Sequence, residues 1–263
     1  MGRSSKLQRA AQLLSGHVLE NITMLKMLEA YRDSIECRLL ERGEEWALIL
    51  CLPVSCSSYD RRSYPEAEAI IMIAGSEQGL MDELLGGLPL GKPLILKCQK
   101  KENRECIEAR FKVTFMRSFY TYSRLVPVPN MEISGDIEES GYNERLVPLW
   151  MNNGYDRQEL LAMFQRGARS YTLYTAGEPV STCLTYYNYD NVWEIGAVFT
   201  RDDQRGKGYA RRVAAAAVNR LLERKLIPRY QVLDSNSASI KVAEALGLSR
   251  VVTLEHLYYD GNT

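Results

Sequence analysis

Residues 193–210 read WEIGAVFTRDDQRGKGYA, and this stretch decides the fold expected for the second half of the chain. An apolar run typical of a strand ends at Thr200, a short charged turn follows, and a glycine-rich segment opens into the alanine-rich helix predicted over 207–224. The first N–H groups of a helix lack partners within the helix and carry a partial positive charge. Because glycines let the backbone approach an anion closely, the stretch predicts a site that holds phosphate groups.

Around this stretch, the residue pattern predicts an order of helix, three strands, helix, strand, helix and strand. The turns between the three consecutive strands are short, with Gly177 in the first, which favours an antiparallel meander. Gly247 ends the helix predicted over 237–246, as glycine commonly does. The helices are expected over 157–167, 207–224 and 237–246, and the strands over 171–175, 179–188, 192–200, 230–233 and 250–259.

The glycine pattern argues against a dinucleotide-binding fold. That fold uses the spacing G-x-G-x-x-G, and after Gly206 and Gly208 the third position is occupied by Arg211. It also alternates parallel strands with helices throughout, whereas three strands in a row precede the loop here. The phosphate group that the loop holds therefore belongs to another kind of ligand.

The loop resembles the signature of the GNAT superfamily of acyltransferases. That signature is Arg or Gln, two residues, Gly, one residue and then Gly or Ala at the head of a helix, and Arg205, Gly208 and Ala210 fit it. The flanking strand and long helix also fall where the family places them. The resemblance implies an α+β fold, in which helices flank a central mixed, mostly antiparallel sheet.

A later segment, 234–248, adds to this resemblance. It is similar to the family's Asn-x-x-Ala … Gly-Phe helix, with Ser239 in place of Ala and Leu248 in place of Phe. Many members place a tyrosine seven residues after the asparagine to protonate the departing thiolate, and here that position is Ala243. The sequence therefore departs from the family pattern at the position of its usual acid.

The first half of the chain predicts nearly the same succession of elements without sequence identity. A helix is expected over 6–32 with a break near Gly16, and strands and helices follow over 35–122 in the order β-β-β-α-β-α-β. A degenerate internal duplication would explain this. A two-domain chain whose first half lacks the signature is similar to the glycine N-acyltransferase-like branch of the superfamily.

The expected domains follow from a stretch rich in proline, glycine and acidic residues. Few contacts are expected to cross that stretch, so it is interpreted as a linker. The chain is divided into an α/β domain over 1–125 with the features of a degenerate GNAT-like domain, a linker over 126–142, and a catalytic GNAT domain over 143–263.

Composition limits the partners. The 33 basic residues balance 33 acidic ones, so no overall field favours nucleic acid or an anionic membrane. Six cysteines without a C-x-x-C pair and two distant histidines argue against a metal and for reduced thiols in the cytoplasm. No apolar run approaches the ~20 residues that span a bilayer. We expect a cytoplasmic monomer or homodimer without nucleic-acid, membrane or metal partners.

By the resemblance, the cosubstrate is acetyl-CoA or another acyl-CoA, held by backbone groups. Core packing is the alternative for Val198 and Phe199, a solvated helix face for Arg211, and helix capping for Asn236. The pantetheine arm would be contacted by Val198, Phe199, Thr200 and Asn236, and the pyrophosphate by Arg205, Gly206, Lys207, Gly208, Tyr209, Ala210 and Arg211.

Glu194 is the candidate general base, on the strand where the glycine N-acyltransferase-like branch carries its glutamate. A protonated amine has a pKa of ~10.4 and must lose a proton before it attacks a thioester. The alternative is a glutamate on the polar face of the strand. Ser239 is a candidate donor to the departing thiolate, although an ordinary first-turn serine is the simpler interpretation. A backbone N–H near Val198 would stabilise the oxyanion.

These features predict an enzyme that moves an acetyl or other short acyl group from acyl-CoA to a primary amine of a small molecule or amino acid. The attack is expected to be direct, because no Cys or Ser with a His partner is placed as a nucleophile. Tyr186, Tyr187 and Tyr189 are candidates to line the acceptor pocket, with packing as the alternative. The competing hypothesis is a non-catalytic module that binds or senses acyl-CoA.

Overall fold

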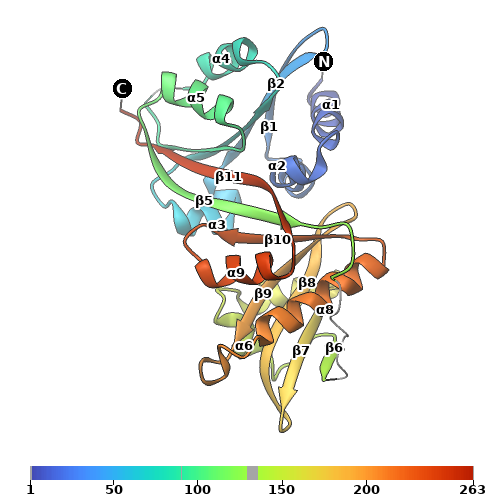
Figure 1. Ribbon diagram of the computed structural model, residues 1–263. Coiled ribbons are helices and arrows are strands. Elements are labelled where there is room, and N and C mark those ends of the chain that lie inside the picture. The colour runs from blue at the N-terminus through green and yellow to red at the C-terminus, as the bar shows by residue number, and fades with distance from the viewer. Residues whose placement is uncertain (1, 90, 129–135, 263) are drawn as a thin grey trace. The chain divides into compact units, whose positions relative to one another are not determined.

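The computed structural model describes residues 2–89, 91–128 and 136–262 (Figure 1). The chain divides into two compact units: unit 1 comprises Met1–Phe119 and Val252–Thr263, and unit 2 comprises Tyr120–Val251. These bounds differ from the predicted domains, because β5 (Val113–Ser123) and β11 (Ser249–Tyr259) each supply residues to both units.

Unit 1 builds its sheet in the order β1-β2-β3-β4-β11-β5. The first three strands are antiparallel, β4 runs parallel to β3, and β11 runs antiparallel to β4. The helix predicted over 6–32 does break near Gly16, into two helices. The elements are α1 (Arg3–Ser15), α2 (Val18–Ala30), β1 (Glu36–Arg42), β2 (Glu45–Pro53), η1 (Val54–Cys56), α3 (Ser58–Ser63), β3 (Ala69–Gly75), α4 (Gln78–Gly86), β4 (Leu94–Cys98) and α5 (Lys101–Arg110).

In unit 2 the strands lie in the order β5-β10-β9-β8-β7-β6. The predicted meander is confirmed, since β7, β8 and β9 pair antiparallel, and β10 runs parallel to β9. The elements are β6 (Ile137–Ser140), α6 (Val147–Met151), α7 (Arg157–Gln165), β7 (Arg169–Thr175), β8 (Glu178–Tyr189), β9 (Val192–Thr200), η2 (Asp202–Gln204), α8 (Tyr209–Glu223), β10 (Ile227–Leu233) and α9 (Ser237–Ala245).

The predicted linker, 126–142, contains structure that the pattern did not predict. Val128 is buried in the core of unit 2, and its N–H donates to Asn219 Oδ1 at 2.8 Å. Further along, β6 pairs with β7, and Glu139 on β6 forms ion pairs with Arg220 and Arg224 of α8. A four-residue edge strand shows too little alternation to be found by pattern. Residues 129–135 lie outside the described residues.

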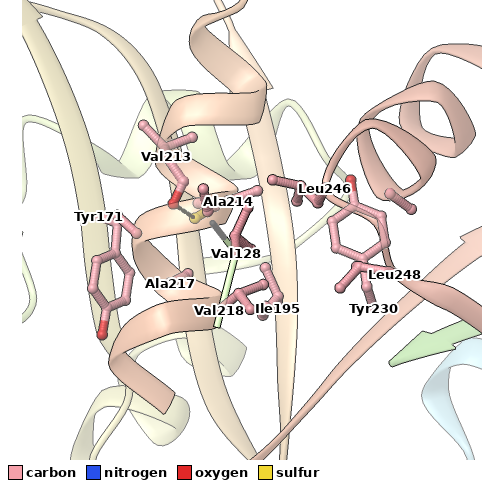
Figure 2. Packing of buried hydrophobic residues seen from close by; sticks show 14 of the residues in the cluster. Val128, Tyr171, Ile195, Val213, Ala214, Ala217, Val218, Tyr230, Leu246 and Leu248 are labelled. Atoms are coloured by element: carbon pink, nitrogen blue, oxygen red, sulfur yellow. Dashed lines mark hydrogen bonds between the residues drawn. The ribbon is translucent and has the colours of Figure 1, made fainter. Parts of the chain in front are cut away.

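The two faces of the sheet in unit 2 pack against different helices. On one face, the apolar side of α8 covers Ile195, and Figure 2 shows Val213, Ala214, Ala217 and Val218 beside it. On the other face, α6 and α7 pack a second cluster around Trp150, which includes Leu184 of β8. Because successive strand residues point to opposite faces, Glu194 lies on the face of α6 and α7.

The last strand of each half of the sequence pairs with a strand from the other half. β11, the last strand of the second half, lies beside β4, and β5, the last strand of the first half, lies beside β10. Ser123 of β5 donates its hydroxyl to the Pro228 carbonyl of β10 at 2.7 Å. The succession of elements that the sequence predicts in both halves is therefore observed, but the final strands are exchanged.

Candidate active site

The glycine-rich loop leads into an α8 N-terminus that has no side-chain cap. The N-cap residue is Gly208 with φ 76°, and Gly206 has φ 79°. Both values lie in the left-handed region, which glycine enters without the strain that a Cβ brings. The first N–H groups of α8 are thus left without a side-chain acceptor from the N-cap position, in a loop shaped by two glycines.

The basic residues of this loop make only exposed contacts. Arg205 Nη2 lies 2.7 Å from Asp202 Oδ1, and their side chains are 64% and 84% exposed. Lys207 donates to Gln204 Oε1 at 2.7 Å, and Arg211 is exposed in the first turn of α8. Exposed ion pairs contribute little, about 0–1 kcal/mol, so a phosphate group competes for these cations at small cost. The predicted residues 205–211 are brought together in one loop and one helical turn.

A β-bulge interrupts β9 where the predicted pantetheine residues begin. The pairing with β8 passes from Thr182↔Phe199 to Leu184↔Gly196, so two residues of β9 oppose one of β8. Ala197 in the bulge has φ 50°, unusual for a residue other than glycine. Val198, the second residue of the bulge, is half-buried, as are Phe199 and Thr200 beyond it, and the carbonyl of Phe199 accepts from the Ser181 hydroxyl at 3.1 Å.

Glu194 is buried, with 4% of its surface exposed, so it is not the surface glutamate of the alternative interpretation. Its Oε2 accepts from Asn188 Nδ2 at 2.8 Å and from Arg229 Nη1 at 2.5 Å, and its Oε1 accepts from the Gln231 N–H at 3.0 Å. Arg229 is equally buried and also donates to Thr121 Oγ1. The carboxylate is therefore fixed by three donors.

The sequence did not single out Arg229 or Asn188. A charged residue inside the strand IPRYQVL of β10 was the available signal for Arg229, because a buried charge requires a partner. Both partners retain one buried polar atom without a hydrogen bond among the described residues, Arg229 Nε and Asn188 Oδ1.

Two tyrosine hydroxyls lie beside the bulge on the same face as Glu194. Tyr186 is the cross-strand partner of Glu194, and its hydroxyl lies 3.0 Å from that of Tyr155. A Cβ added at Gly196 would come within 2.8 Å of one hydroxyl and 2.9 Å of the other. Burial raises the pKa of both phenols. Tyr155, between α6 and α7, carried no sequence signal.

The start of α9 shows the roles of Asn236 and Ser239. Asn236 Oδ1 accepts from the Ser239 N–H at 3.1 Å, which is a helix cap. The Ser239 hydroxyl lies 2.7 Å from that of Tyr230, and burial raises the pKa of Tyr230 to about 12. Ala243 is fully buried in the core. Contact of Asn236 with pantetheine, and of Ser239 with a thiolate, stay predictions.

The described residues contain neither a cluster of metal ligands nor a membrane-spanning helix. No group of three or more His, Cys, Asp or Glu side chains in the described part of the chain is arranged to hold a metal ion. Within the same residues, no helix is long and apolar enough to cross a membrane.

Comparison with known protein families finds a match in the second half of the chain. Residues 133–256 match the family model described as GNAT acetyltransferase. No curated protein matches the sequence. The matched stretch contains the uncapped helix, the bulge and Glu194, so the similarity to this family covers the candidate site.

Solved structures share the fold at low sequence identity. A tandem GNAT protein from the clavulanic acid biosynthesis pathway is 10% identical with a TM-score of 0.56, covering 99% of this chain and 96% of its own. A GNAT-family acetyltransferase from Colwellia psychrerythraea is 11% identical with a TM-score of 0.57, covering 91% of this chain and 96% of its own. A GCN5-related N-acetyltransferase-like protein from Streptococcus suis is 17% identical with a TM-score of 0.52, covering 98% of this chain and all of its own. The predicted α+β fold is confirmed.

Proposed function

We propose that this protein transfers an acetyl or other short acyl group from acyl-CoA to a primary amine of a small molecule or amino acid. The observation that carries the proposal is the uncapped N-terminus of α8 behind Gly206 and Gly208, within the stretch that matches an acetyltransferase family. Such an N-terminus favours phosphate oxygens, because its N–H groups and helix dipole both attract negative charge.

The donor lies along β9 in this proposal. The pyrophosphate accepts from the N–H groups of 206–211, and the exposed cations Arg205 and Lys207 turn toward it. The pantetheine arm follows the half-buried backbone of Val198, Phe199 and Thr200. Its thioester then reaches the bulge at Ala197, where the ladder between β8 and β9 is interrupted.

The reaction is a direct attack. The amine lone pair forms a C–N bond with the thioester carbonyl carbon, the C–S bond breaks, and CoA leaves as the thiolate. The nitrogen must shed a proton, and Glu194 is the proposed acceptor. Because Oε2 already accepts two hydrogen bonds and Oε1 accepts one, the remaining lone pair of Oε1 is the one that receives the proton, directly or through one water.

A small molecule or amino acid is the proposed acceptor, as expected from the sequence. The family match at 133–256 is to GNAT acetyltransferases in general and does not distinguish among acceptors. The cytoplasmic setting, the monomer or homodimer and the lack of a metal requirement stay predictions.

The first experiment is a calorimetric titration with CoA, followed by release of free thiol from acetyl-CoA in the presence of pooled amines. We expect CoA to bind in the micromolar range and thiol release to depend on at least one amine. Absence of CoA binding at high micromolar concentration would falsify the proposal.

The variant Glu194→Gln separates an enzyme from an acyl-CoA sensor. Removing a general base is expected to lower kcat by about 10²–10⁴-fold while leaving the Kd for CoA unchanged. The matched control is Glu138→Gln on β6, which alters an exposed carboxylate. Bound CoA shows that the variant is folded. A sensor predicts that neither protein turns over, and equal kcat for the two variants would remove Glu194 as the base.

A further inference from the structure

The hydroxyl pair of Tyr155 and Tyr186 is a second functional feature beside the bulge. The two oxygens are 3.0 Å apart, and they approach Gly196 so closely that any side chain there would collide with both. The rings meet edge to face, with centroids 6.4 Å apart. Glycine at 196 thus brings two hydroxyls against the backbone of β9, immediately before the bulge.

A count of protons shows that the pair has a donor to spare. Two phenols carry two protons, and the hydrogen bond between them uses one. Whichever phenol donates to the other, one O–H remains available beside the bulge. Burial raises the pKa of both phenols, so both protons stay in place at neutral pH.

The position of the spare donor matches the place where charge develops in the proposed reaction. Gly196 and Ala197 directly precede Val198, where the proposed pantetheine path begins. Tyr186 is also the cross-strand partner of Glu194, so the donor and the proposed base lie on one face of the sheet. As whole residues both tyrosines are half-buried.

We propose that the Tyr155–Tyr186 pair supplies a catalytic hydrogen bond to the oxyanion formed when the amine attacks the thioester. This inference rests on the proposed acyl transfer. The step involves no proton transfer from the phenols: the carbonyl oxygen gains negative charge as the C–N bond forms, the spare O–H donates to it, and the carbonyl reforms as the C–S bond breaks.

The pair also compensates for the missing acid of the family pattern. Ala243 is buried and has no proton to give, and the nearest hydroxyl on α9, that of Ser239, is bound to Tyr230. Stabilising the oxyanion lowers the barrier to forming the intermediate, and the thiolate then leaves without a dedicated proton donor. In this proposal the hydroxyls of Tyr155 and Tyr186 therefore act on the carbonyl oxygen of the thioester and not on the departing sulfur.

The test uses Tyr155→Phe, Tyr186→Phe and the double variant in the full-length protein. Phenylalanine keeps the ring and removes only the hydroxyl, and Tyr174→Phe on β7 is the matched control. Each single change is expected to lower kcat about 10- to 100-fold, in line with loss of one oxyanion donor, with the Kd for CoA within about twofold of the unchanged protein. The double variant should lose less than the product of the single losses, because the hydroxyls act as a unit.

Two further readouts distinguish catalysis from packing. Thermal unfolding should be the same in the Phe variants and the control, and the KM for the amine should change far less than kcat. Unchanged kcat in the double variant, with turnover intact in the unmodified protein, overturns the inference and leaves the proposed function standing. A parallel loss of CoA binding and stability assigns the pair a structural role and also overturns it. An unmodified protein that releases no thiol with any amine overturns both.

Discussion

The N-termini of α4 in unit 1 and α8 in unit 2 occupy the same place in the succession of elements but differ in what caps them. Each helix follows the third strand of an antiparallel trio and precedes a parallel strand. At α8 the N-cap is Gly208, without a side chain. At α4 the N-cap is Glu77, whose carboxylate accepts from the N–H groups of Gly79 at 2.8 Å and Leu80 at 2.6 Å.

The contrast teaches that the order of elements does not by itself make an anion site. In unit 1 the chain places its own anion on the helix, and those two N–H groups lower the pKa of Glu77. The connection is also short, since β3 ends at Gly75 and α4 begins at Gln78. In unit 2, Arg201 to Gly208 separate β9 from α8, so the connection before the helix is longer.

A second contrast concerns the buried ion pairs. Arg229 lies opposite Glu194 in the parallel register of β10 and β9, and Lys97 lies opposite Met72 in that of β4 and β3. Unit 1 therefore has a methionine where unit 2 has the proposed base. Lys97 pairs instead with Asp60 of α3 at 2.6 Å, and both side chains are almost fully buried. At these equivalent positions among the described residues, unit 2 has an N-cap without a side chain and a buried carboxylate on the preceding strand, whereas unit 1 has Glu77 and Met72.

The largest effect is expected from breaking the ion pair of unit 2. Arg229→Met leaves Glu194 buried without its cation and should lower the free energy of unfolding by about 3–5 kcal/mol. Urea unfolding followed by the fluorescence of Trp150 and Trp193, both in unit 2, measures this. Adding Glu194→Met should restore most of the loss. An unchanged urea midpoint in the single variant contradicts the prediction.

The counterpart in unit 1 sharpens the comparison. Lys97→Met leaves Asp60 with the Ser57 hydroxyl as its remaining side-chain partner among the described residues and should also destabilise. CoA affinity should survive in conditions where the variant stays folded. If Lys97→Met weakens CoA binding as strongly as changes in the α8 loop do, the two units are not functionally separate.

The next largest effect is expected at the glycine-rich loop before α8. Gly208→Asp places a negative charge at the start of α8, as Glu77 does at α4, and should weaken CoA binding about 100-fold through repulsion of the phosphates. The control is Gly208→Asn, which has nearly the same shape, also tolerates positive φ and carries no charge. Calorimetry should give the Asn variant a Kd within a few-fold of the unchanged protein. Equal losses in both would mean that shape rather than charge governs the site.

The smallest effect is expected from Glu77→Gln. Because the folded pKa of Glu77 lies below its ordinary value of 4.5, its carboxylate contributes stability that is present above that value and is lost as pH falls through the folded pKa. The melting temperature of the unchanged protein should therefore approach that of the variant as pH falls below about 4.5. The variant should still bind one CoA per chain, and a second equivalent would show that the cap alone blocks unit 1.

The local sequence was enough for the order of elements and for the glycine-rich loop that opens into α8. Helix and strand periods, the turn at Gly177 and the spacing of Arg205, Gly208 and Ala210 all lie within a few residues of one another. The break near Gly16 followed from the same short-range pattern. Four-residue β6 and the short helices α3 and α6 were missed, because so few residues carry too little periodicity.

Only the tertiary structure decided the partners. The contacts between Glu194 and Arg229, between Tyr155 and Tyr186, and between Lys97 and Asp60 each join residues more than 30 positions apart. The exchange of β5 and β11 has the same origin, since strand pairing depends on which edge is available and not on the strand's own residues. The sequence by itself determined where the glycine-rich start of α8 lies, because glycines and a helix start act locally. Which carboxylate, cation and hydroxyls gather beside that site was decided by packing, because burial pairs charges and hydroxyls across the sheet.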